Sequence, residues 1–452
     1  MAPGAIDWGL GATGVIAAGG GPRGRASGRA TLRTRGQATP AREGRRWRAR
    51  EQAVFSALEE RDFRLLWVGA ASGFLGFFMS VVVQAVVAFQ LTGENIAVGW
   101  VVFGRGLAMA LLGPIGGAMT DRISKRAILL TSQAVTSVVF AVMAVLMGTG
   151  EMTVTYLVLG GFLVGTSFAF VGPARQAYAV ELVPEAKRGN AVAINQVALN
   201  ATRVVGPAVA GWLLAHRFGA TGAFVLMAGL YAFAIVCHAM LPRYQHTGPV
   251  SERGVLADIA EGLRYVNSRP HLRSLVLYYV LVIMLGFPYV TVLPGLVEHV
   301  LHRDAQAVSV LFTTSAAGGL VAALAVTPLA DSRRAIAVHL SAGAGFALSL
   351  LGLAHVETMF EANVAVIAIG VSTGVVSTLN GAVLLRATER RYFGRVMSLA
   401  MMAFAGFGLV GLPIGLLADV YGERWCLRLM GVAVFLVVVV LGPVIARTEP
   451  AR

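Results

Sequence analysis

Long apolar runs recur along the chain from about residue 64 to residue 446, and short polar joins separate them. Each run reaches the roughly 20 residues that a helix needs to cross the hydrocarbon core of a bilayer. The pattern therefore predicts an all-α membrane protein with twelve transmembrane helices. We delimit these helices at 64–90, 96–118, 127–148, 153–175, 190–215, 221–241, 274–297, 306–329, 335–354, 362–384, 395–418 and 426–446.

Composition agrees with this prediction. Apolar residues make up 56% of the chain and charged residues 13%, with a mean hydropathy of +0.72, whereas a soluble domain carries about 25% charged residues. Cys237 and Cys426 both lie in apolar runs, too far apart for a disulfide framework or a zinc site. The eight histidines show no metal-binding spacing, so we expect no metal and no bound cofactor.

Positive charge is distributed unevenly over the joins. The even-numbered joins carry sixteen arginines and lysines, and the odd-numbered joins carry three, Arg217, Arg303 and Arg424. Basic residues resist translocation and stay on the cytoplasmic side. We therefore predict a multi-pass protein of the plasma membrane with both termini cytoplasmic. The net charge of +14 follows from the same rule, so we expect no nucleic-acid partner.

The one long join, 242–273, divides the runs six and six. Its middle, 255–265, has apolar residues at helical spacing, which suggests an amphipathic helix on the cytoplasmic face; a plain tether is the alternative. Three short stretches recur at offsets of 203, 210 and 209 residues. Residues 213–219 match 416–422, the stretch that begins at Asp121 matches the one that begins at Asp331, and the stretch from Phe63 matches the one from Leu272. We therefore predict two related six-helix halves, 54–241 and 274–452.

The first 53 residues lack apolar periodicity and are rich in Gly, Ala and Arg, with ten arginines between Arg23 and Arg50. This composition predicts disorder. Residues 9–21 are too rich in glycine for a secretory signal, and no apolar run follows Arg45 and Arg46 as twin-arginine export requires. This segment could bind nucleic acid or anionic lipid, but no motif supports either role. Another alternative is that translation starts near Val54.

The segment 116–126 joins the second and third runs and reads G-G-A-M-T-D-R-I-S-K-R. Asp121 stands where the second helix leaves the bilayer, with Gly117 one turn earlier on the same face. Such an acid can bind the positive N-terminal end of another helix, and the glycine lets that helix come close. Topology alone would explain the basic residues but not Asp121. We predict a cytoplasmic latch formed by Gly117, Asp121, Arg122, Lys125 and Arg126, with a partial repeat in Asp331, Arg333 and Arg334, against Gly394 and Arg395 at the start of the eleventh helix.

Two arginines lie deep in predicted helices. Arg203 stands 13 residues after Asn190, about 20 Å along the helix, and Arg105 lies about nine residues into the second run. A charge at that depth is costly and indicates function, although an arginine bonded to a neighbouring helix is the alternative. Gly206, Pro207 and Gly211 favour a bend and close packing in the same helix as Arg203. Further candidates for lining a cavity are Gln84, Asn195, Asn200 and Asn380.

Four segments carry a resemblance to a known family. The pattern G-x-x-x-D-R-x-x-K-R at 117–126, the segment 206–211 and the wider run 173–207 together with 393–398 resemble the major facilitator superfamily, in its branch of macrolide efflux proteins and the enterobactin exporter. The resemblance covers about residues 60–446. It implies two pseudo-symmetric halves that open alternately to either side of the membrane. It also implies a monomeric exporter whose substrate is an amphipathic small molecule, such as a drug, an antibiotic or a siderophore-like metabolite.

Other functions stay open at this point. An importer of the same fold is the nearer alternative, and a membrane-embedded enzyme is a more distant one, because the chain shows no clustered set of Asp, His and Ser. No nucleotide-binding G-x-x-x-x-G-K-S/T motif occurs, so we expect no ATP hydrolysis by this chain, and the resemblance implies a proton gradient as the energy source. Proton-coupled exporters of the family often carry a carboxylate in the first or fourth helix; this chain has none there, and the coupling residue stays unassigned. Deep arginines without deep acids predict neutral or anionic substrates rather than cations.

Overall fold

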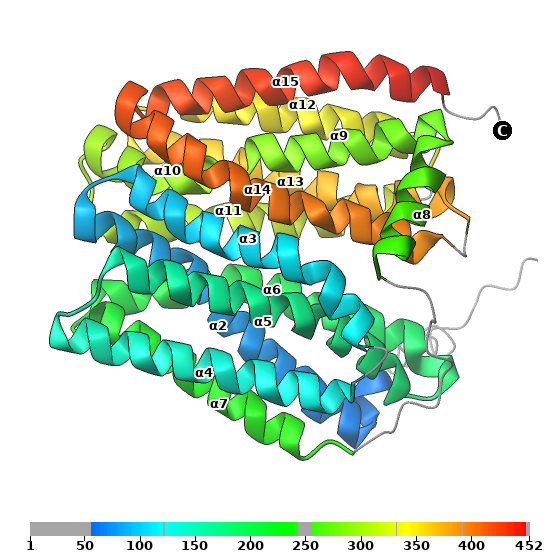
Figure 1. Ribbon diagram of the computed structural model, residues 1–452. Coiled ribbons are helices and arrows are strands. Elements are labelled where there is room, and N and C mark those ends of the chain that lie inside the picture. Colours follow the sequence, from blue (N-terminus) through cyan, green and yellow to red (C-terminus); the bar gives the residue numbers. More distant parts are fainter. Residues whose placement is uncertain (1–55, 121–122, 243–254, 331, 390–391, 449–452) are drawn as a thin grey trace, which may run out of the picture. The chain divides into compact units, whose positions relative to one another are not determined.

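The computed structural model describes residues 56–120, 123–242, 255–330, 332–389 and 392–448 (Figure 1). Within these ranges the regular secondary structure is helical, and they contain no strand. All of them belong to one compact unit, Gln52–Arg452. The predictions made for residues 1–53 lie outside the described ranges.

Six long helices make up the amino-terminal half. The longest, α2, carries an almost unbroken apolar sequence, and α5 continues to Glu181, past its predicted end at 175. The helices are α2 (Arg61–Thr92), α3 (Asn95–Thr120), α4 (Lys125–Thr149), α5 (Val154–Glu181), α6 (Arg188–Ala215) and α7 (Gly219–Ala239), with short 3-10 turns at η1 (Ser56–Glu59) and η2 (Glu185–Lys187).

The second half repeats this plan with one break. Its seventh span breaks between Gly286 and Tyr289, because Pro288 cannot donate a helix hydrogen bond. The span then ends in a π-helical turn. The helices are α8 (Val255–Asn267), α9 (Pro270–Gly286), α10 (Tyr289–Gly295), the π turn η3 (Leu296–Val300), α11 (Ala305–Val326), the 3-10 turn η4 (Thr327–Leu329), α12 (Ala335–Leu353), α13 (Met359–Ala387), α14 (Phe393–Tyr421) and α15 (Glu423–Thr448).

The predicted twelve spans are confirmed. In the described residues, eleven segments are long and apolar enough to cross a membrane, and Ala405–Tyr421 of α14 adds a shorter apolar helix. Local signals set their ends. Gly93 and Gly150 adopt φ of 72° and 78° and close α2 and α4, while Thr358 and Glu361 form a reciprocal capping box at the start of α13.

Successive spans run in opposite directions, so the bundle has two ends (Figure 1). We call the end with α8 and the joins after α3, α5 and α13 the linker end. The opposite end, with the joins after α2, α4, α6 and α14, is the far end. Where the sequence suggested an amphipathic helix at 255–265, the structure has α8, which packs against α9 and α14.

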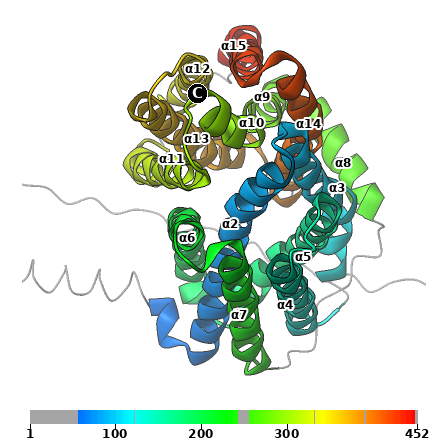
Figure 2. The same ribbon diagram turned by 90° about the vertical axis from the view of Figure 1, so that its left-hand side faces the viewer.

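The two halves meet along two helix pairs, α3 with α14 and α6 with α11, and Figure 2 shows the grouping from the far end. Glycines let α3 and α14 approach to backbone contact. A Cβ on Gly106 would lie 2.5 Å from Gly408 Cα, and a Cβ on Gly99 would lie 3.0 Å from Gly411 O. We refer to Gly99, Gly106, Gly408, Gly411 and Gly415 as the glycine seam.

Candidate functional site

Arg105, one of the two predicted deep arginines, lies in a buried polar cluster inside the amino-terminal half. Its guanidinium donates to Gln84 Oε1 and, at 3.4 Å, to Ser80 Oγ on α2. It also stands 5.4 Å from the ring centre of Phe77. Gln84 is fully buried. The structure therefore brings Arg105 and Gln84 together as a contact between α3 and α2.

Arg203, the other predicted deep arginine, lies between the halves. It stands on α6, half-buried, within electrostatic reach of Tyr279 on α9 and Tyr289 on α10. Both tyrosines belong to the carboxy-terminal half and are almost fully buried. An arginine near two tyrosines of the other half can bind the carbonyl or carboxylate of a molecule between the halves through its fork of donors.

The glycines that follow Arg203 serve two different contacts. A Cβ on Gly206 would lie 2.7 Å from Phe78 Cβ on α2, whereas a Cβ on Gly211 would lie 1.8 Å from Ser309 Oγ on α11. Gly206 therefore permits packing within the amino-terminal half, and Gly211 permits packing across the two halves. Pro207 lies buried inside α6 between them.

The three asparagines proposed to line a cavity are spread over two helices. Asn195 and Asn200 lie on α6, and Asn380 lies on α13. Asn195 and Asn380 are buried, and Asn200 is half-buried. Asn195 Oδ1 has no hydrogen-bond partner among the described residues. Their part in transport stays a prediction.

The centre of the predicted cytoplasmic latch falls outside the described residues. This holds for Asp121, Arg122 and Asp331, and for the side-chain surroundings of Gly117 and Gly394. The latch itself therefore stays a prediction.

The described basic residues of the latch form ion pairs and hydrogen bonds near the linker end. Lys125 pairs with Glu181 on α5 at 2.9 Å, and Arg126 donates to the carbonyls of His238, at 3.3 Å, and Ala239 on α7. Arg395 on α14 pairs with Glu261 on α8 at 3.2 Å. Arg333 and Arg334 are exposed.

A carboxylate joins the two halves at the far end. Asp419, near the end of α14, accepts hydrogen bonds from the backbone N–H groups of Asn95 (2.7 Å) and Ile96 (2.8 Å), and from Asn95 Nδ2 (3.1 Å). These N–H groups open α3, where the helix dipole is positive. A Cβ on Gly415, one turn before Asp419, would lie 2.7 Å from Asn95 O, so only glycine permits the approach.

Two further groups extend this contact. Glu423, 6% exposed at the start of α15, accepts from Asn95 Nδ2 at 2.9 Å. His299 in the π turn lies with Nδ1 2.8 Å from the same Glu423 oxygen. We refer to Asn95, His299, Asp419 and Glu423 as the far-end clasp. It ties Asn95, together with the backbone N–H of Ile96, in the amino-terminal half to three residues of the other half.

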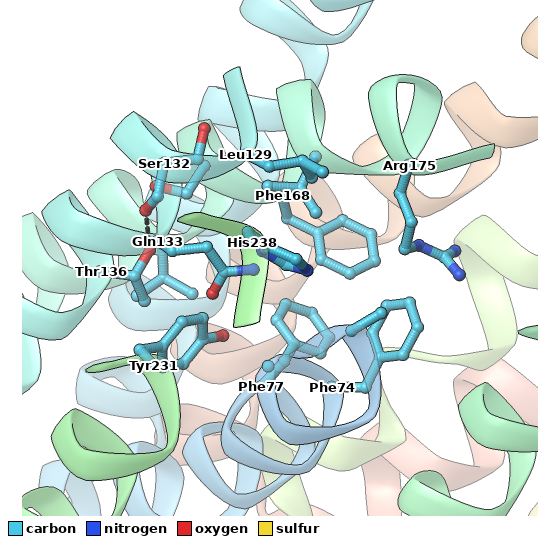
Figure 3. Close-up of a pocket in the computed structure, with 15 residues that line it drawn as sticks. Phe74, Phe77, Leu129, Ser132, Gln133, Thr136, Phe168, Arg175, Tyr231 and His238 are labelled. Carbon is cyan, nitrogen blue, oxygen red and sulfur yellow. Dashed lines mark hydrogen bonds between the residues drawn. The ribbon is translucent and has the colours of Figure 1, made fainter. Parts of the chain in front are cut away.

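A small pocket opens inside the amino-terminal half, among α2, α4, α5 and α7. Figure 3 shows Arg175 beside the rings of Phe74 and Phe168, with Gln133 and His238 across the pocket. Arg175 is 6% exposed, Gln133 3% and His238 fully buried. The remaining lining is mostly apolar and includes no acid. We call this space the side pocket.

Sequence reasoning missed both the clasp and the pocket. The clasp had a signal, because Gly415 and Asp419 repeat the glycine-to-acid spacing of Gly117 and Asp121. Arg175 was hidden by the predicted end of its span at 175, which placed it at the membrane surface. Since α5 continues to Glu181, Arg175 lies inside the bundle instead.

The fold and these contacts define a multi-pass membrane protein with two helical halves. The model of the Major Facilitator Superfamily matches residues 66–411, and the chain belongs to this family of secondary transporters. The staphyloferrin A transporter of Staphylococcus aureus (strain NCTC 8325 / PS 47) is 24% identical over 357 residues, which cover 78% of this chain and 89% of that protein. Macrolide efflux protein A of Streptococcus pyogenes is 22% identical over 371 residues, covering 80% and 89%.

Solved structures share the fold at low identity. The nucleoside transporter NupG superposes with a TM-score of 0.69 at 11% identity, over 85% of this chain and 98% of that one. The human organic anion transporter MFSD10 gives a TM-score of 0.61 at 16% identity, over 85% and 99%. At these identities the likeness concerns the arrangement of helices alone.

Proposed function

We propose that this transporter exports amphipathic small molecules by opening alternately at its two ends. The observation that carries the proposal is the far-end clasp, whose hydrogen bonds join the halves and must break before that end can open. A contact present in one state only biases the equilibrium between the two openings. Similarity to a macrolide efflux protein supports export rather than import.

The charges of the bundle support neutral or anionic substrates. Arg105 and Arg203 lie at depth, and the buried acid among the described residues, Glu423, belongs to the far-end clasp. A lipophilic cation between the halves would meet repulsion without a compensating carboxylate. A carbonyl, phenolate or carboxylate would instead gain hydrogen bonds from arginine.

In this proposal the linker end faces the cytoplasm and a proton gradient drives the cycle. Reporter fusions at Gly150, Gly219, Arg303 and Glu357 then read outside, and a fusion at Arg334 reads inside. A cytoplasmic reading at two of the four outer sites would overturn the orientation.

The proposed function is tested by a susceptibility screen of cells with and without the chain. We expect higher tolerance of an amphipathic compound and faster energy-dependent efflux of it. Matched neutral, anionic and cationic probes then test the charge preference, with Arg203→Ala as the variant. Accumulation of a nutrient inside the cell would identify an importer. Strong export of ethidium that Arg203→Ala leaves unchanged would contradict the charge preference.

A further inference from the structure

Arg175 is a buried cation without an acidic partner among the described residues. Its Nε and one terminal nitrogen, Nη1, are inaccessible and have no hydrogen-bond partner there. Its guanidinium carbon stands 4.3 Å from the centre of the Phe74 ring, a cation–π contact that offsets part of the cost of burial. A buried charge with unused donors remains unfavourable until an anion reaches it.

The side pocket provides room and apolar contact for such an anion. Its unfilled space is about 30 Å³, whereas a single water molecule needs about 10–15 Å³. The rings of Phe77 and Phe168 stack at 4.4 Å and form part of the lining together with Phe74. Gln133 adds a buried amide to the lining, and its NH2 group can donate to an anion.

We propose that the side pocket binds the carboxylate end of the transported molecule, with Arg175 as its counter-ion. The two carboxylate oxygens match the parallel donors of a guanidinium, and the apolar remainder of the molecule packs on Phe74, Phe77 and Phe168. This inference rests on the proposed function, and it narrows the substrate class to amphipathic carboxylates.

The first test uses the stability of the full-length protein in detergent without ligand. A buried cation that awaits a ligand contributes little to folding, so Arg175→Met should leave the melting temperature unchanged or raise it. A fall of more than about 3 °C would show that Arg175 has a structural partner within the chain, and this would overturn the inference.

The second test measures binding of benzoate against its neutral counterpart benzamide, by calorimetry and by the shift in melting temperature. We expect benzoate to bind at least tenfold more tightly than benzamide. Arg175→Gln should remove this preference, and Arg175→Lys should keep part of it. Arg217→Gln, which changes an exposed arginine at the far end, is the matched control and should bind benzoate normally.

The outcomes separate this inference from the proposed function. A preference for benzoate that survives Arg175→Gln, or equal stabilisation by chloride, would overturn the inference. Efflux of neutral compounds from cells whose protein fails to bind benzoate would also overturn it and leave the proposed function in place. Arg175-dependent benzoate binding without transport of any compound would overturn the proposed function and retain the pocket as a carboxylate site.

Discussion

The two ends of the bundle use the same short sequence pattern in helices that run in opposite directions. At the far end, Gly415 and Asp419 of α14 meet the first turn of α3. At the linker end, Gly117 and Asp121 follow the same spacing, and their predicted partner is the start of α14. Because α3 and α14 form an antiparallel pair, the end of each helix lies near the beginning of the other.

The comparison suggests how one helix pair can hold either end of the bundle closed. An acid at the end of one helix can bind the free N–H groups at the start of its neighbour. In the proposed cycle, a tilt of the halves that opens one end separates one acid from its partner and brings the other acid toward its own; for Asp121 this partner is a prediction. The far-end contact is described in atomic detail, whereas the linker-end contact stays a prediction.

The largest effect is expected from the glycine seam, because the close approach of α3 and α14 underlies both the far-end clasp and the predicted latch at the linker end. Gly106→Val places a branched side chain against the backbone of Gly408 and costs about 3 kcal/mol or more. Transport should be lost, with a lower melting temperature. Gly113→Val on the same helix is the control, because a Cβ there meets nothing within 4 Å. Equal effects of the two variants would contradict the role of the seam.

The next effect is expected at the far-end clasp. Asp419→Asn removes the charge from two hydrogen bonds to the backbone of α3, a loss of about 2 kcal/mol, or roughly 30-fold in the ratio of the two openings. The distance between labels at Glu94 and Val420 should lengthen, and transport should slow. Asp304→Asn, an exposed acid at the same end, is the control. An unchanged distance distribution would argue against the clasp.

Asp121→Asn tests the other gate and should shift the equilibrium in the opposite direction. We expect transport to slow about tenfold, with folding and insertion intact, because a single charged contact of about 1–2 kcal/mol is lost. Efflux is compared at matched expression, with Asp62→Asn, at the start of α2, as the control. Normal rates in Asp121→Asn would refute the predicted latch.

The smallest effect is expected where α8 meets α14. The pair of Arg395 and Glu261 is partly exposed, with side chains 30% and 29% accessible, so Arg395→Gln should cost about 1 kcal/mol or less. Transport should change less than about fivefold. Glu261→Gln should change transport by the same amount if the loss of the ion pair causes the effect. A complete loss of transport in Arg395→Gln alone would assign this arginine a larger role at the linker end.

The sequence predicted the fold because a bilayer demands long apolar helices, which short polar joins separate along the chain. It identified Arg105 and Arg203 because arginine is rare at depth. It did not reveal that Arg105 binds Gln84 and Ser80, since this pairing depends on how α3 packs on α2. Arg175 was missed through an error in a helix end, which sequence locates poorly. Asp419 was missed because its partner is 324 positions away in the chain.

The position of the close contact between Gly106 and Gly408 determines how far each end of α14 would move if the halves turned about it. Asp419 lies 11 residues beyond Gly408 and Phe393 lies 15 residues before it, or about 16 Å and 22 Å along α14. If the halves turn about this contact, drawing Asp419 about 3 Å away from α3 requires a rotation of roughly 11°. The same rotation displaces the start of α14 by about 4 Å. The longer lever arm therefore belongs to the linker end, which opens wider than the far end for the same turn.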